Sequence, residues 1–307
     1  MKILVTGATG LVGSALVAAL ARDGHMVCRL VRPQTKTEGG AAGTFDVAWN
    51  PETGELGGAA VGAEAVINLG GASIASGRWT DARKRLLRTS RVEATRALVT
   101  ALGRMNARPD VMVSASAIGF YGNRADEVLT EESAPGNDFL AGISKDWETE
   151  ALRTEEFRTR VVIARFGIIL AKNGGALPKM MLPFEFGAGG RVGNGKQWMS
   201  WVALEDVIEI IRFALNNREL RGAVNVVAPE PVTNAEFTKQ LARAMHRPAL
   251  FPAPAFALRL ALGEMADALL LTSQRVVPGL LTKVGYRFLD PSLGPALKKL
   301  SESQPKK

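Results

Sequence analysis

Short apolar runs alternate with amphipathic segments through the first half of the chain. The first run, at 3–5, is followed by glycines and by an amphipathic segment at 14–23, the order of a strand, a tight turn and a helix. Strands that alternate with helices are typical of a parallel sheet covered by helices on both faces. Similar runs predict further strands at 26–31, 43–50, 61–69, 110–116 and 159–166.

Three glycines, Gly7, Gly10 and Gly13, separate the first strand from its helix. Gly7 allows the sharp turn, Gly10 removes a Cβ where a pyrophosphate would approach, and Gly13 lets the helix pack against the sheet. The helix N-terminus offers free N–H groups to phosphates. The spacing is GxxGxxG and differs from the usual GxGxxG. The prediction of a dinucleotide site therefore depends on the strand before the glycines and the helix after them. The other predicted loop contacts are Thr9, Leu11 and Val12.

The pattern changes after the last of these strands. Glycines and prolines interrupt the segment 167–203, and signals for a helix and a strand return at 204–216 and 223–228. We therefore expect an α/β fold, with a doubly wound parallel sheet of Rossmann type and a smaller C-terminal α+β substrate domain. The expected division is 1–166 with about 204–228 for the first domain, and about 167–203 with 229–307 for the second.

Two longer segments are open to more than one interpretation. The segment 78–104 is predicted to be one long helix with a basic face, which could contact nucleic acid, remain solvated, or turn Arg91 toward an adenosine phosphate. No aromatic residues alternate with these cations to stack on bases, so nucleic acid is disfavoured. The apolar stretch 248–271 is interrupted by charged residues, which predicts a buried helix instead of a membrane span.

Charge and cysteine content restrict the partners of the chain. Its 307 residues include 38 basic and 30 acidic side chains, and a phosphate-bearing cofactor is a sufficient acidic partner for the net charge of +8. Cys28 is the only cysteine, which excludes an internal disulfide and fits a reducing cytoplasm. With two histidines far apart in sequence, no metal centre is expected. We expect a cytoplasmic monomer or homodimer with a small-molecule substrate and no membrane partner.

The end of the second predicted strand indicates which dinucleotide to expect. NAD-selective sites place Asp or Glu there, about 20 residues after the glycines, to bind the ribose hydroxyls. This chain has Arg32 and no acid at that point. Because arginine pairs well with a 2′-phosphate, we predict NADP(H) in preference to NAD(H), with an ordinary surface arginine as the alternative. Leu69 and Gly70 end the fourth strand and are expected to contact the same cofactor.

Three stretches together resemble the extended short-chain dehydrogenases/reductases: TGATGLVG at 6–13, SASAIGFYG at 114–122 and SWVALEDV at 200–207. More narrowly, the chain resembles the atypical, epimerase-like oxidoreductase subfamily of human SDR family 39U member 1 and bacterial YfcH-type proteins. The resemblance covers essentially the whole chain and implies a Rossmann-type domain, a smaller C-terminal domain and NADP(H). The narrower match rests on NLGG at 68–71, RWT at 78–80, SRV at 90–92, WE at 147–148, GKQW at 195–198, GEM at 263–265 and SQRV at 273–276.

The resemblance also defines a catalytic question. The superfamily uses Ser or Thr with a Tyr-x-x-x-Lys pair, in which the lysine lowers the tyrosine pKa for proton exchange with the substrate. Ser116 matches the serine and Lys145 the lysine, but Ala141 stands where the tyrosine would be. Tyr121 is expected either to replace the missing acid or to line the pocket, and Lys145 either to touch the cofactor ribose or to be exposed. Arg165 is expected to face the cofactor or substrate, or to bridge to an acid.

Two classes of function therefore remain open. The first is an NADP(H)-dependent oxidoreductase or epimerase-like enzyme for a small carbonyl or hydroxyl compound, with a nucleotide sugar suggested by family analogy alone. The second is a non-catalytic NADP(H)-binding or sensor protein that keeps the fold. The candidate substrate-pocket residues are Met180, Phe184, Gln197, Trp198 and Trp201.

Overall fold

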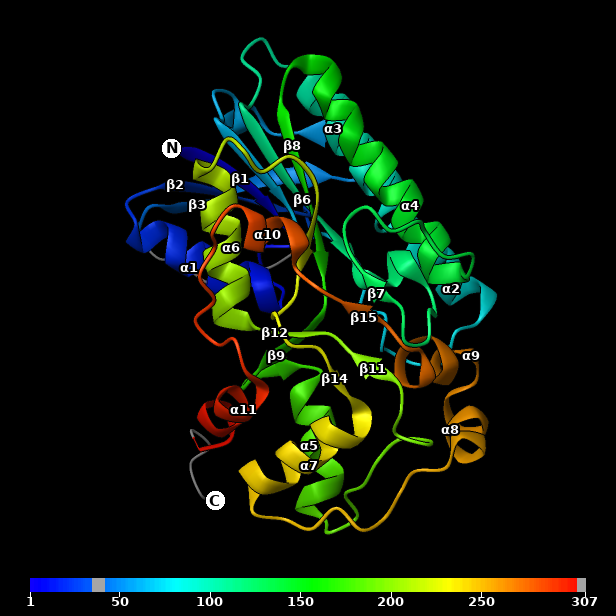
Figure 1. Cartoon of the computed structure of the whole chain (residues 1–307). Helices are drawn as coiled ribbons and strands as arrows, with labels where there is room; N and C mark the ends of the chain where they lie inside the picture. The colour runs from blue at the N-terminus through cyan, green and yellow to red at the C-terminus, as the bar shows by residue number, and fades with distance from the viewer. Residues whose placement is uncertain (35–41, 303–307) are drawn as a thin grey trace.

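A large, mostly parallel sheet forms the centre of the first unit (Figure 1). The computed structural model describes residues 1–34 and 42–302. Seven neighbouring strands are parallel, and β4 at one edge pairs antiparallel with β3. The strands stand in the order β13 (Gly222–Val226), β8 (Arg160–Phe166), β6 (Val111–Ala117), β5 (Ala65–Asn68), β1 (Lys2–Thr6), β2 (Met26–Val31), β3 (Thr44–Asn50) and β4 (Glu55–Leu56).

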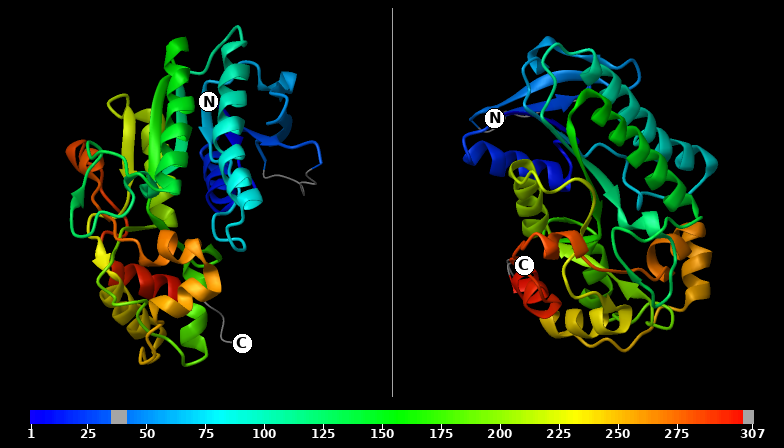
Figure 2. Two further views of the ribbon diagram at one scale, coloured as in Figure 1. Left: turned by 90° about the vertical axis from the view of Figure 1, so that its right-hand side faces the viewer. Right: turned by 45° about the horizontal axis from the view of Figure 1, so that its top comes forward.

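Both faces of this sheet are buried, and successive side chains along a strand enter different cores. Ile3 of β1 packs in the core under α1 (Leu11–Arg22) and α6 (Leu204–Asn216), whereas Leu4 packs in the core under α3 (Val92–Gly103) and α4 (Phe139–Leu152). Figure 2 shows helices on both sides of the sheet. Two-sided burial explains why the strands are almost continuously apolar, and the predicted Rossmann-type α/β fold is confirmed.

The second unit lies at the end of the sheet where β8 leads into β9 (Figure 1). Trp201, Phe184 and Phe237 are buried in its core. Its strands form the group β10 (Gly174–Gly175), β9 (Ile168–Ala171) and β12 (Trp201–Ala203) and the pair β11 (Trp198–Met199) and β14 (Val232–Thr233). Its core is packed by helices α5 (Leu177–Glu185), α7 (Asn234–Met245) and α11 (Leu293–Glu302).

The chain passes repeatedly between the two units. After β12 it returns to the large sheet as α6 and β13, and α10 (Gly279–Lys283) later packs against β13. In addition, β15 (Arg275–Val276) pairs with β7 (Val128–Leu129), which joins segments far apart in sequence. These returns hold the second unit against the carboxyl edge of the sheet.

The prediction of one long helix over 78–104 is wrong. The segment forms α2 (Asp81–Thr89), capped by the Thr80 side chain, and a separate α3 that begins after Arg91. At the break, Ser90 Oγ accepts a hydrogen bond from the Ala72 amide at 3.1 Å. The helix is interrupted because its backbone turns to meet the loop after β5.

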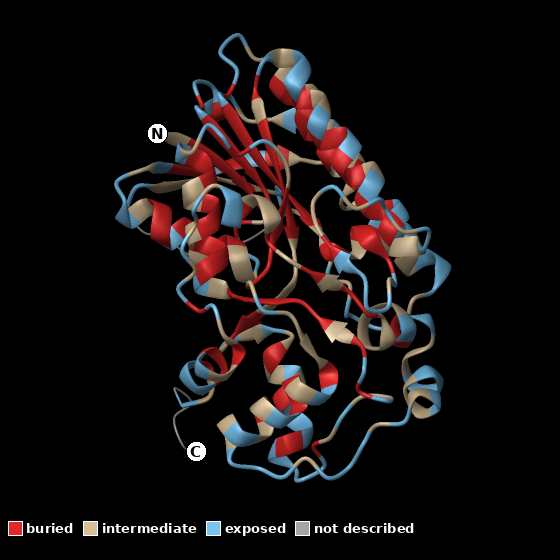
Figure 3. Ribbon diagram, viewed as in Figure 1, coloured by how far each residue is buried: buried red, intermediate tan, exposed pale blue. Residues whose placement is uncertain are grey.

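The prediction of a buried helix in 248–271 is also wrong. The stretch holds α8 (Ala255–Leu262), α9 (Glu264–Ala266) and the π-helical turn η4 (Asp267–Leu271), and α8 contains no buried residue. Phe256 and Leu260 on α8 are 73% and 79% exposed, and the helix is mostly pale in Figure 3. The apolar sequence of α8 therefore did not lead to burial of the helix. No described helix combines the length and apolar character needed to cross a membrane.

Candidate functional site: a dinucleotide crevice beside a buried polar network

The carboxyl ends of β1 and β5 define the candidate site. The connection after β1 leads to β2 on one side, whereas the connection after β5 leads to β6 on the other, and such switch points form crevices that bind ligands. Thr6 Oγ1 donates to Asn68 Oδ1 at 2.7 Å and accepts from the amides of Leu69 and Gly70 at 3.0 and 3.1 Å. One hydroxyl therefore fixes the two strand ends relative to each other.

The glycine loop after β1 has positions with different spatial requirements. Gly7 has a φ of +64°, and a Cβ there would lie 2.6 Å from the Leu69 carbonyl oxygen. A Cβ on Gly13 would lie 2.1 Å from the Gly7 oxygen. At Gly10 the nearest atom to an added Cβ is that same oxygen, at 3.3 Å. Gly7 and Gly13 are thus required by packing, while Gly10 leaves space beside the loop.

The N-terminus of α1 is suited to an anion. Its N-cap is Gly10, which supplies no side-chain cap, and the first turn holds no acidic residue. The amide of Ser14 bonds to the Gly10 oxygen at 2.9 Å, whereas the amides of the preceding turn have no carbonyl of the same helix to reach. Leu11 packs beside Gly174 and Gly175 of β10, so the second unit borders the same loop.

Two arginines flank this crevice without a carboxylate partner among the described residues. Arg32 is exposed directly after β2, while Arg29 is paired with Asp46 at 2.6 Å. The Arg91 guanidinium donates to the carbonyls of Ala72 and Leu87 and lies 5.4 Å from the Trp147 ring. Burial, followed by the nearby charge of another arginine, lowers the pKa of Arg91 to about 10, so it remains a cation at neutral pH.

A buried polar network occupies the neighbouring strand ends, β6 and β8. Arg165 is 5% exposed and forms two hydrogen bonds with the Glu148 carboxylate, at 2.8 and 2.7 Å. Ser116 Oγ donates to the same carboxylate at 2.6 Å. The Arg165 guanidinium also lies 3.5 Å from the centre of the Phe120 ring. Of the roles left open for Arg165, the bridge to an acid is the one observed.

Tyr121 belongs to the same network and is fully buried. Its hydroxyl accepts from Arg165 at 2.9 Å and donates to Asn225 Oδ1 at 2.6 Å. Burial raises the pKa of Tyr121 above its ordinary value, although the Arg165 charge opposes this shift. The phenol is therefore protonated at neutral pH, and both hydrogen-bonding directions of its oxygen are in use.

The helix that carries the usual Tyr-Lys pair is α4. Ala141 is fully buried on it, and Lys145 is exposed one turn later. Lys145 forms no ion pair with any residue that the structure describes. Of the three candidate catalytic residues, Ser116 and Tyr121 are joined through Glu148 and Arg165, whereas Lys145 stands apart from the network.

The candidate substrate residues do not form one open pocket wall. Trp201 and Phe184 are buried in the second core, and Met180 packs against it. The Gln197 amide donates to the carbonyls of Val192 and Leu270, at 3.1 and 3.0 Å. Trp198 Nε1 donates to Asp126 at 2.8 Å, and an arginine lies over its ring. These contacts hold most of the set in internal packing or hydrogen bonds.

Sequence reasoning missed the roles of Glu148, Asn225 and Thr6. Ser116 and Arg165 lie opposite each other on adjacent strands. An acidic residue on the helix that covers these strands was the one signal that could have predicted their shared partner, Glu148. Asn225 lies on β13 beside Arg165, in a pairing that only the sheet order reveals. Thr6 directly precedes Gly7, and nothing in the sequence indicated that its hydroxyl would join β1 to β5.

Comparison with known proteins identifies the class of this chain. Residues 3–227 match the model of the NAD dependent epimerase/dehydratase family, and residues 253–300 match a domain of unknown function, DUF1731. The chain belongs to the NAD-dependent epimerase/dehydratase family, and the predicted resemblance to epimerase-like short-chain dehydrogenases/reductases is confirmed.

Similar proteins match this chain along nearly its whole length. It is 40% identical over 296 residues to the epimerase family protein ML0860 of Mycobacterium leprae, covering 96% of this chain and 94% of that protein. It is 38% identical to the chloroplastic SDR39U1 homolog of Arabidopsis thaliana, covering 94% and 83%. The crystal structure of human SDR39U1 with NADPH superimposes with a TM-score of 0.89 at 31% identity, covering 99% of this chain and all of the human chain.

Proposed function

We propose that the crevice between β1 and β5 binds NADP(H). The observation that carries this proposal is the uncapped N-terminus of α1, which lies at the switch point of the sheet directly after Gly7 and Gly10. Amides at a helix N-terminus bind pyrophosphate well, and the space beside Gly10 allows close approach. The NADPH complex of human SDR39U1 supports the same choice.

The surrounding residues would hold the cofactor in a defined direction. The backbone of 9–13 binds the pyrophosphate, and Leu69 with Gly70 lies along the adenosine side of the crevice. Arg32 pairs with the 2′-phosphate, which gives the preference for NADP(H) over NAD(H). Arg91, which has no carboxylate partner among the described residues, adds a second cation near the loop after β5. Bound in this way, the reduced cofactor supplies a hydride.

The proposed reaction is oxidation, reduction or epimerisation of a small carbonyl or hydroxyl compound, with nucleotide sugars as one candidate class. Because Ala141 replaces the usual tyrosine, no proton passes through a Tyr-Lys pair on α4. Ser116 and Tyr121 then act as positioning residues through Glu148 and Arg165, since their hydroxyl protons are donated within the network. The exposed ammonium of Lys145 is assigned to the cofactor ribose.

A non-catalytic NADP(H)-binding or sensor protein is the second candidate. The observation that favours it is the closed network itself, in which the hydroxyls of Ser116 and Tyr121 both donate to other side chains. A raised pKa for Tyr121 is also the reverse of the shift that the superfamily uses for proton exchange. Under this alternative the protein binds the cofactor tightly without hydride transfer.

Cofactor oxidation measured at 340 nm over a panel of carbonyl compounds, including nucleotide sugars, tests the two candidates. Oxidation of a hydroxyl compound needs NADP+, and epimerisation consumes no net cofactor, so the panel is also run with NADP+ and its products are analysed for epimers. The enzymatic proposal predicts net cofactor turnover or an epimer with at least one class, and a fall in kcat/KM for Ser116→Ala and Tyr121→Phe. Tight NADPH binding with neither net cofactor turnover nor epimer formation across the panel would establish the non-catalytic alternative. If activity is found and both variants retain it in full, the proposed role of the β6 strand end is wrong.

A further inference from the structure

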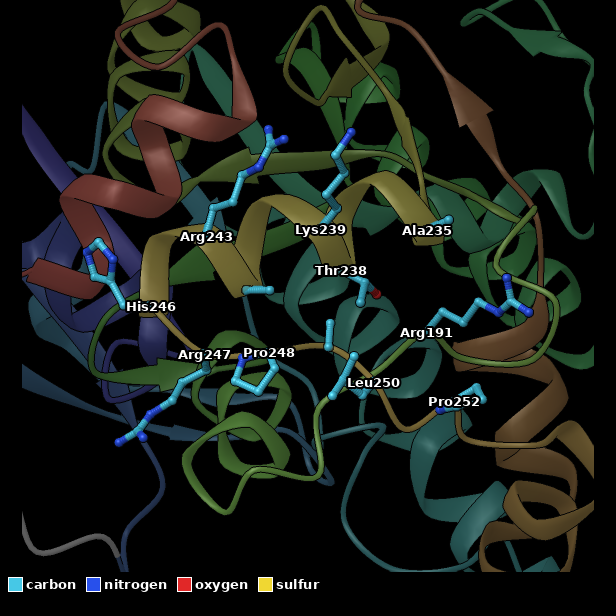
Figure 4. Close-up of a pocket in the computed structure, with 12 residues that line it drawn as sticks. Arg191, Ala235, Thr238, Lys239, Arg243, His246, Arg247, Pro248, Leu250 and Pro252 are labelled. Carbon is cyan, nitrogen blue, oxygen red and sulfur yellow. The ribbon is translucent and has the colours of Figure 1, made fainter.

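A pocket in the second unit lies apart from all of the residues assigned to the cofactor. It has a volume of about 810 Å³ and is formed between α7 and the segment that follows it. Figure 4 shows its lining side chains, and Figure 1 places α7 in the second unit, away from β1 and α1. The pocket is open to solvent, and most of its lining residues are exposed.

The lining of this pocket is strongly cationic. Arg191, Lys239, Arg243 and Arg247 all line it, together with His246, and no Asp or Glu is among its described lining residues. Lys239 has a carboxylate at 3.8 Å, on Glu236, whereas the three arginines form no ion pair within the described part of the chain. Several uncompensated guanidinium groups around one cavity favour an anionic ligand.

The arrangement of these cations favours more than one negative charge on the ligand. In Figure 4 the side chains of Lys239 and Arg243 extend side by side from α7, and Arg191 and Arg247 lie toward other edges of the pocket. A ligand that contacts several of these groups at once must present more than one anionic oxygen. A diphosphate presents several oxygens and more charge, and guanidinium groups bind phosphate oxygens in pairs.

The floor of the pocket indicates the body of the ligand. Thr238, Pro248 and Leu250 lie between the charged side chains in Figure 4. The other uncharged lining residues are small alanines and a proline, and His246 is the one ring available for stacking in the described lining. Nucleobases are usually stacked on aromatic or guanidinium planes, so this floor is better suited to an aliphatic group than to a base.

The family models do not account for this pocket. They match 3–227 and 253–300, and all of its lining residues except Arg191 lie in the segment between them. From the charge, size and floor of the cavity, we propose that it binds a ligand that carries a diphosphate or phosphate group on an aliphatic body. The source is either a free prenyl-type diphosphate or the headgroup of an acidic lipid.

Calorimetric titration of the full chain with geranyl diphosphate tests this proposal. We expect saturable binding both with and without NADPH, and much weaker binding of pyrophosphate or geraniol alone. The double variant Arg243→Glu/Arg247→Glu should weaken binding by about a hundredfold, because each lost charge-assisted contact is worth about tenfold in affinity. Both side chains are exposed, so the substitutions leave the core intact.

The matched control is Arg221→Glu, which reverses an exposed arginine outside the pocket and should leave binding unchanged. NADPH affinity, measured on the same samples, should be equal in all three proteins. Co-sedimentation with phosphatidic acid vesicles, but not phosphatidylcholine vesicles, would assign the lipid source if the double variant abolishes it. The proposal is overturned by the absence of binding to both probes, by equal losses in control and double variant, or by competition from NADPH.

Discussion

At the scale of single residues, Arg165 connects the groups around the β6 and β8 strand ends. It pairs with Glu148, donates to Tyr121 and to the Glu131 carbonyl, and lies against Phe120. Its side chain is only 6% exposed, and several hydrogen bonds offset the cost of removing its charge from water. Removing one member therefore leaves other polar atoms buried without a partner.

We predict that Arg165→Met lowers the free energy of unfolding by about 3–5 kcal/mol, because the Glu148 carboxylate stays buried without its partner. Urea denaturation measures the change. The matched control is Arg259→Met, whose ion pair with Asp267 is exposed and should contribute little to stability. A loss in Arg165→Met no larger than in the control would contradict the role assigned to the network.

The two tyrosines give a pH prediction. Burial raises the pKa of both Tyr121 and Tyr286, with Asp206 adding to the shift at Tyr286. Since the folded-state pKa exceeds the unfolded value of about 10, this contribution to stability is complete below about pH 10 and is lost as pH rises toward the folded values. Absorbance at 295 nm should therefore show tyrosinate only as the protein unfolds.

The control for this titration is the chain in guanidinium chloride, where both phenols should ionise near pH 10. A phenol that ionises at or below pH 10 while circular dichroism remains native would show that Tyr121 or Tyr286 is less enclosed than its contacts indicate.

At the scale of elements, the β1 turn and α1 form the proposed cofactor loop, and its glycines should differ in their sensitivity to substitution. Gly10→Ala places a methyl group 3.3 Å from the nearest atom, so the fold should tolerate it. The same methyl group occupies the space where the pyrophosphate approaches, so NADPH affinity should fall by about tenfold. Thermal unfolding and calorimetric titration of one sample separate the two effects.

Gly58→Ala is the control, because an added Cβ there meets no atom within 4 Å. Gly13→Ala is the contrasting variant, since its Cβ would lie 2.1 Å from the Gly7 oxygen and should destabilise the fold itself. Unchanged NADPH affinity in a folded Gly10→Ala protein would mean that the cofactor does not approach this turn.

The elements show which features the sequence could predict. Strands β1, β2, β6 and β8 were predictable because two-sided burial makes them continuous apolar runs. The break between α2 and α3 was not, since it depends on Ser90 meeting a loop from another strand. The exposure of α8 could not be predicted either, because the hydropathy of a segment does not show which elements pack against it.

The candidate site divides in the same way. The cofactor loop is local in sequence, so the steric needs of Gly7, Gly10 and Gly13 could be read from their spacing and flanking elements. The buried network joins Ser116, Glu148 and Asn225 from three separate elements, and only the register of the sheet and the position of α4 bring them together.

At the scale of the whole molecule, the crevice is bordered by both units. Leu11 of the cofactor helix packs beside β10, and the Arg78 guanidinium donates to the Leu260 carbonyl at 3.2 Å. Close to it in sequence, an ion pair joins Lys84 of α2 to Glu264 of α9. These contacts join the unit that carries the glycine loop to the second unit on both sides of the crevice, which suits a site that encloses a dinucleotide between them.

Calorimetric titration of the full chain with NADPH and NADH, repeated on Arg32→Glu, tests the central claim most directly. We predict that the unaltered protein binds NADPH more tightly by about tenfold or more, because Arg32 pairs with the 2′-phosphate. The variant should lose this preference and bind NADH more tightly, because an acid at this point binds the ribose hydroxyls, while its melting temperature stays nearly constant. Equal affinities or tighter NADH binding in the unaltered protein, or a preference that survives in Arg32→Glu, would contradict the account.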